Sequence, residues 1–92
     1  MKFNEIKERL DEIDEDILLA DGFEGALVGF VDGWVGGSRG QVALYDREKC
    51  IQILVKRDKM TEEEAEEYFE FNTAGAYVGE KTPVFATFLK RK

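Results

Sequence analysis

The segment TEEEAEEYFEFN, residues 61–72, constrains the fold most because both the start and the buried face of a helix can be read from it. Thr61 followed three residues later by Glu64 is a capping box, in which each side chain binds the other residue's backbone amide. Helical spacing predicts an inward face made of Ala65, Tyr68, Phe69 and Asn72. The glutamates fall elsewhere, so the segment predicts an amphipathic helix with an acidic outer face.

Two other stretches also predict helices. Residues 3–22 place apolar side chains at spacings of 3, 4, 3 and 4, which defines a narrow apolar seam of Phe3, Ile6, Leu10, Ile13 and Ile17. Such a seam can dock on its own domain or pair with a second copy, as heptad seams do. Asp46 is a good N-cap for a further helix, which ends near the basic pair Lys56 and Arg57.

Three short stretches have the composition of strands: ALVGFV, QVALYD and PVFATFL. The first two flank GWVGGSRG, residues 33–40, whose four glycines predict a long, mobile hairpin loop. The predicted order is therefore α-β-β-α-α-β. We expect an α+β fold with a small antiparallel sheet of about three strands and helices packed on one face. It forms a single domain, 1–92, with an acidic amphipathic helix at 1–22 and an α+β core at 23–92.

The residue types present exclude several chemistries. The chain has no histidine, which removes the commonest general base and metal ligand. Ser38 is the only serine and has no histidine to activate it, and Cys50, the only cysteine, is expected to be a small buried hydrophobe. We therefore predict no catalytic residues, no metal site and no cofactor. No apolar run has the length of a membrane span, so the sequence predicts a soluble, intracellular protein without membrane contact.

The chain carries a net charge of −7, with its acidic residues concentrated in the first and last thirds. A negative domain is repelled by phosphate backbones, so nucleic acid is an unexpected partner. The same charge attracts a protein with a basic surface.

Three segments resemble a family of small uncharacterised proteins encoded by phages, prophages and other mobile elements: ALVGFVD, ALYDREKCIQILVKRDKMTEEEAEEYFEFN and GAYVGEKTPVF. They cover about residues 25–85, and the run 45–85 is the most specific part. The resemblance implies a phage-type protein in the cytoplasm of a prokaryotic host, and it implies no site residues. The acidic helix 1–22 and the GWVGGSRG segment depart from the family pattern. The chain is similar to anti-CRISPR proteins in size, charge and source only.

The leading hypothesis is a non-enzymatic inhibitor that binds a basic surface on a host defence or nucleic-acid-handling protein, in the manner of a DNA mimic. Its predicted partner-binding residues are Glu5, Glu8, Asp11, Glu12, Glu15, Trp34, Glu62, Glu63, Glu66, Glu67 and Glu70. One alternative is a structural or accessory homodimer formed through the apolar seam. The other is a weak nucleic-acid or ligand-binding module that uses Arg39, Arg47, Lys49, Lys56, Arg57 and the basic tail 90–92.

Overall fold

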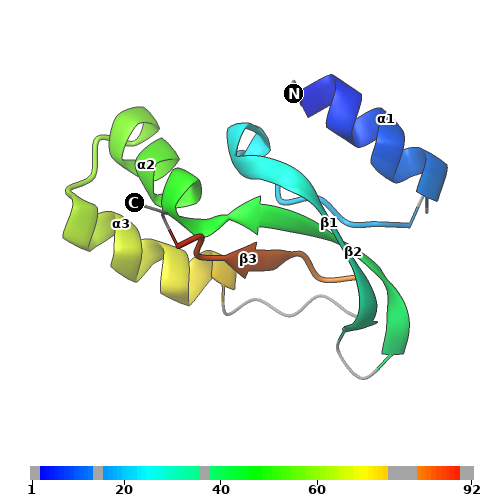
Figure 1. Ribbon diagram of the computed structural model, residues 1–92. Helices are drawn as coiled ribbons and strands as arrows, with labels where there is room; N and C mark the ends of the chain where they lie inside the picture. The colour runs from blue at the N-terminus through cyan, green and yellow to red at the C-terminus, as the bar shows by residue number, and fades with distance from the viewer. Residues whose placement is uncertain (1–2, 14–15, 36–37, 75–80, 90–92) are drawn as a thin grey trace.

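The computed structural model of the chain describes residues 3–13, 16–35, 38–74 and 81–89 (Figure 1). The helices are α1 (Phe3–Ile13), α2 (Arg47–Arg57) and α3 (Glu62–Phe69), and the strands are β1 (Leu27–Val35), β2 (Ser38–Asp46) and β3 (Val84–Ala86). A 3-10 turn, η1 (Glu24–Ala26), precedes β1, and a π-helical turn, η2 (Glu70–Ala74), continues α3. The α+β class and the order α-β-β-α-α-β are those that the sequence predicted.

The sheet is mixed, so the prediction of an antiparallel sheet is wrong for its third strand. The strand order is β1-β2-β3; β1 and β2 are antiparallel, whereas β3 runs parallel to β2. A parallel neighbour requires a crossover connection rather than a tight turn. The two helices α2 and α3 stand between β2 and β3 in the chain and provide that crossover.

The hairpin is longer than predicted, because its strands continue into the glycine-rich segment. Gly33 pairs with Gly40 and Trp34 with Arg39, so residues predicted to form a mobile loop belong to the backbone ladder. Ladder hydrogen bonds come from the backbone, so glycines can extend it. Gly33 has φ +147, a conformation that suits glycine. The side chains of Trp34 and Arg39 lie outside the described part of the structure, so the predicted Trp34 anchor stays a prediction.

The starts of α2 and α3 confirm the predicted capping signals. The Asp46 side chain accepts a hydrogen bond from the Lys49 amide at 3.3 Å. Thr61 Oγ1 accepts one from the Glu64 amide at 3.1 Å, while Glu64 Oε1 accepts one from the Thr61 amide at 2.9 Å. Each bond satisfies an amide that has no partner within the helix itself.

The first helix is shorter than the predicted 3–22. It ends at Ile13, and Ile17 lies in the irregular segment that leads to η1, partly buried against the core. The sequence supplies a reason, because residues 14–16 are three consecutive acids. Negative charge at a helix C-terminus opposes the helix dipole.

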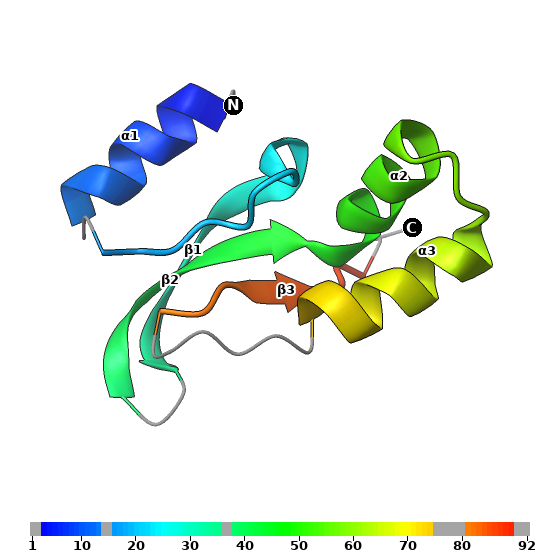
Figure 2. The same cartoon turned by 180° about the vertical axis from the view of Figure 1, so that it is seen from behind.

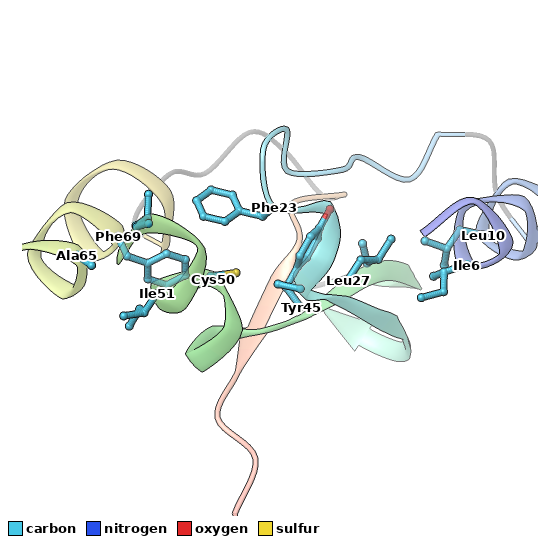
Figure 3. Packing of buried hydrophobic residues seen from close by; sticks show 12 residues of the cluster. Ile6, Leu10, Phe23, Leu27, Tyr45, Cys50, Ile51, Ala65 and Phe69 are labelled. Atoms are coloured by element: carbon cyan, nitrogen blue, oxygen red, sulfur yellow. The ribbon is translucent and has the colours of Figure 1, made fainter. Parts of the chain in front are cut away.

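A single hydrophobic core joins the helices to the sheet (Figure 3). Its aromatic centre is Phe69 of α3, whose ring meets Phe23 and Phe85 edge-on at centroid distances of 6.1 and 5.0 Å. The Phe85 ring also lies 5.4 Å from that of Tyr45. Because these four residues come from four separate segments, the core fixes where α3 sits relative to the sheet.

Figures 1 and 2 place the helices in two groups. In both views α2 and α3 pack together at one end of the sheet, whereas α1 lies apart from them, beside the other end. The helices α1 and α3 therefore lie at different ends of the sheet.

Candidate functional site

The acidic face of α3 is the most strongly charged surface of the described helices. Glu63, Glu66 and Glu67 are exposed and form no ion pair with any described residue. The other two predicted partner-binding glutamates of this region have contacts within the chain. Glu70 Oε1 accepts hydrogen bonds from Arg47 Nη2 and Nε at 2.7 and 3.2 Å, and Glu62 accepts one from Gln52 at 3.3 Å. Three of the five carboxylates thus remain uncommitted.

The acidic face of α1 is partly neutralised by its own helix. Lys7 forms an ion pair with Asp11 at 2.9 Å. Arg9 lines a shallow surface hollow together with Glu5, Glu8 and Glu12. All four acids of α1 are exposed, and Glu15 lies outside the described residues. Since α3 contains no basic residue, its field is the more negative of the two.

The structure does not bring the two acidic faces together. The helices α1 and α3 that carry them lie at opposite ends of a molecule that measures 36 × 30 × 28 Å (Figures 1 and 2). The two faces are therefore separate candidate contacts for a partner.

An aromatic hollow adjoins the acidic face of α3. We use this name for a surface hollow of about 380 Å³ lined by Met60, Glu64, Glu67, Tyr68, Phe71 and Asn72. Tyr68 is 44% exposed and Phe71 85% exposed. Asn72 Nδ2 donates a hydrogen bond to the Tyr68 carbonyl at 3.1 Å, which holds one wall in place. Exposed aromatic rings next to uncommitted charges are the residue types that dominate protein interfaces.

The prediction that Tyr68 and Asn72 face inward is wrong. Of the four predicted residues, only Ala65 and Phe69 are buried. They lie one helical turn apart, on the face of α3 that packs against the core. Phe71 did not enter the sequence hypothesis as a functional residue. A signal was present, since Phe71 falls off the predicted inward face and is an aromatic residue among glutamates.

The basic residues of the second alternative are only partly clustered. Lys49, Lys56 and Arg57 line a shallow hollow on α2 with Gly25, Gln52 and Ile53. Arg57 is already engaged, because it binds Asp58 at 3.0 Å and the Gly22 carbonyl at 2.8 Å. Arg47 is engaged with Glu70 instead. The side chain of Arg39 and the tail 90–92 lie outside the described part.

The apolar seam of the self-association alternative is largely used inside the chain. Ile6 and Leu10 belong to the core, with exposures of 7% and 2%. Ile17 is partly buried, Ile13 is 39% exposed, and the Phe3 side chain is outside the described part. In this conformation Ile13 is the most accessible described member of the seam.

Cys50 has the properties of a core residue, as expected. It is fully buried, and burial foremost, with the nearby Asp46 carboxylate, raises the pKa of its thiol to about 12. A thiol in this environment stays protonated and is a poor nucleophile.

Two further observations concern the described residues as a whole. They contain no group of three or more histidine, cysteine, aspartate or glutamate side chains placed to hold a metal ion. None of their helices has both the length and the apolar character that crossing a membrane requires.

Comparison with known proteins adds no relative to these observations. No protein-family model, curated protein or solved structure matches the chain.

Proposed function

We propose that this protein is a non-enzymatic interaction protein that binds a basic surface of a host protein through α3 and inhibits it by occlusion. The observation that supports this most is the juxtaposition of the uncommitted Glu67 carboxylate of α3 with the exposed rings of Tyr68 and Phe71. The proposed target is a host defence or nucleic-acid-handling protein in a prokaryotic cytoplasm, as the phage-type resemblance implies.

The chemistry favours α3 over α1 as the principal contact. Complementary charge steers the encounter and selects the partner, but affinity comes mainly from aromatic and arginine anchors that become buried. The α3 surface offers both charge and aromatic anchors, since Glu67 lines the aromatic hollow and Glu63 and Glu66 are exposed on the same helix. On α1, Lys7 and Arg9 reduce the negative field.

Occlusion of a nucleic-acid site follows from the charge of the groups. Carboxylates on successive turns of a helix present negative charge to lysine and arginine side chains that otherwise contact phosphates. Exposed charges are screened by salt, so binding should weaken as the ionic strength rises.

The experiment uses the full chain as bait for a prokaryotic lysate at low salt, with washes that rise stepwise to high salt. The captured protein is then purified, and its affinity is compared between E63K/E66K/E67K and a matched variant, E5K/E8K/E12K. Each variant changes three charges by two units, from −7 to −1. We expect strong loss for the α3 variant and a small change for the α1 variant.

Two outcomes would contradict the proposal. Equal losses in the two variants would mean that net charge, rather than α3, determines binding. An affinity that does not change with salt would exclude the electrostatic mechanism.

A further inference from the structure

The aromatic hollow contains the groups that bind an arginine side chain. Two aromatic rings, from Tyr68 and Phe71, stand beside the carboxylates of Glu64 and Glu67, and the Met60 thioether completes the apolar wall. A guanidinium group stacks on aromatic faces, pairs with carboxylates and is only weakly hydrated. Its aliphatic stem can lie against the apolar wall while the charged end reaches the carboxylates.

The same combination of groups occurs twice inside the chain with its arginine present. Arg47 lies over the Phe69 ring, 5.6 Å from the centroid, and pairs with Glu70. Arg57 lies 5.7 Å from the centroid of the Phe23 ring and pairs with Asp58. In both cases an aromatic face and a carboxylate together hold one guanidinium group.

The hollow has the rings and the carboxylates but no arginine. Among the residues that the structure describes, no arginine or lysine lies over the ring of Tyr68 or of Phe71. We propose that an arginine side chain of the basic partner occupies this hollow. This inference rests on the proposed function and names the side chain that the partner must supply.

The hollow is held in shape by contacts within the chain. Glu64 Oε1 accepts the Thr61 amide hydrogen bond at 2.9 Å, so this carboxylate is fixed at one side. Hydrogen bonds from the Thr61 backbone, and then from its side chain, lower the pKa of Glu64 below its usual value. The carboxylate therefore keeps its charge in neutral solution, and a bound side chain does not have to order it.

The test measures binding of a defined probe to the full chain labelled with ¹⁵N. The probe is a capped glycine–arginine–glycine peptide, and the control peptide has citrulline, which is uncharged and of similar shape, in place of arginine. We expect amide shifts concentrated in residues 64–72 with the arginine peptide only.

Variants locate the binding site. Phe71→Ala should weaken the probe about two- to fivefold, which corresponds to an exposed cation–π contact. Its matched control is Phe88→Ala, which removes another exposed ring, 51% accessible, outside the hollow. Glu67→Gln should also weaken binding, and its control is Glu5→Gln, which neutralises an exposed carboxylate of α1 outside the hollow. Phe71 and Phe88 are exposed, so neither substitution should disturb the fold.

Several results would overturn the inference. These are shifts that spread equally to the glutamates of α1, equal binding of the citrulline peptide, no shift at a large excess of probe, or equal affinity for a lysine peptide. The proposed function fails separately. If reversal of the α3 charges abolishes partner binding but Phe71→Ala binds the partner normally, the proposed arginine site is refuted and the proposed function stands. If the peptide binds the hollow but charge reversal on α3 leaves partner binding unchanged, the function is wrong and the site stands.

Discussion

The hydroxyl of Tyr45 accepts a hydrogen bond from the amide of Ala20, with 2.8 Å between the oxygen and the nitrogen. Tyr45 is fully buried on β2, whereas Ala20 belongs to the irregular segment between α1 and η1. That segment has no helix or strand to satisfy its amides, so a side-chain partner from the sheet is needed where it is buried. The contact attaches the segment, and with it α1, to the body of the domain.

Tyr45→Phe should lower the free energy of unfolding by about 1–2 kcal/mol, because it leaves the Ala20 amide without its partner while the ring is kept. Urea denaturation followed by circular dichroism measures the change. Tyr68→Phe is the matched control, since its hydroxyl is on a side chain that is 44% exposed, and it should change stability by less than about 0.5 kcal/mol. Equal effects of the two substitutions would contradict the structural role of this bond.

Cys50 should make stability depend on alkaline pH. Its pKa rises from an ordinary 9.0 to about 12 in the folded chain, so the unfolded state loses its proton first. The contribution is fully present below pH 9 and is lost between pH 9 and about 12, with a slope of up to about 1.4 kcal/mol per pH unit. Tyr45 adds to the decline above pH 10, because burial also raises its pKa.

Urea denaturation at pH 7, 8, 9 and 10 checks this dependence, with Cys50→Ala as the control. The substitution should reduce the decline between pH 9 and 10. An identical decline in the variant would show that other groups cause it.

Thr61→Ala should destabilise the protein by about 1 kcal/mol, because it removes one half of the capping box of α3. Thr61→Ser keeps the hydroxyl and should restore most of the loss. The partner Glu64 has a lowered pKa, so its contribution is present above its ordinary pKa of 4.5 and is lost as the pH falls through the lower value. Thermal unfolding of the three proteins at neutral and acidic pH measures both effects, and equal stability of Thr61→Ala and wild type would refute the first.

Leu10→Ala should lower the free energy of unfolding by about 2–5 kcal/mol. Leu10 is 2% exposed, so its truncation leaves a cavity between α1 and the sheet. Ile13→Ala, at a position that is 39% exposed, should cost much less. Sedimentation of both variants separates docking from self-association. If α1 pairs with a second copy instead, Leu10→Ala will reduce the sedimentation coefficient rather than the stability of the monomer.

Signals within a few residues predicted the helices well. The N-cap at Asp46 and the capping box of Thr61 and Glu64 each depend on atoms within one helical turn, and the structure contains both. The end of α1 was missed, although acids after Ile13 disfavour continuation. The apolar spacing that continues to Ile17 favours a longer helix, and the prediction follows that spacing rather than the acidic residues.

Features that depend on distant residues were predicted less well. The direction of β3 is decided by where α2 and α3 return the chain, which no local pattern encodes. Gly33 extends its strand because Gly40 of the other strand lies opposite it, and this register cannot be read from either segment alone. The aromatic hollow was missed for a similar reason, since the exposure of Tyr68 depends on which side of α3 meets Phe23 and Phe85.

The parallel pairing of β3 with β2 has a consequence for the order of folding during synthesis. The β1–β2 hairpin and the α2–α3 pair use neighbours in the chain, so they can form early and quickly. The sheet cannot be completed until residues 84–86 reach residues 44–46, and Phe85 is needed to cover Tyr45 and Phe69. Until Phe85 has emerged from the ribosome, the nascent chain therefore exposes part of its aromatic core to chaperones and proteases.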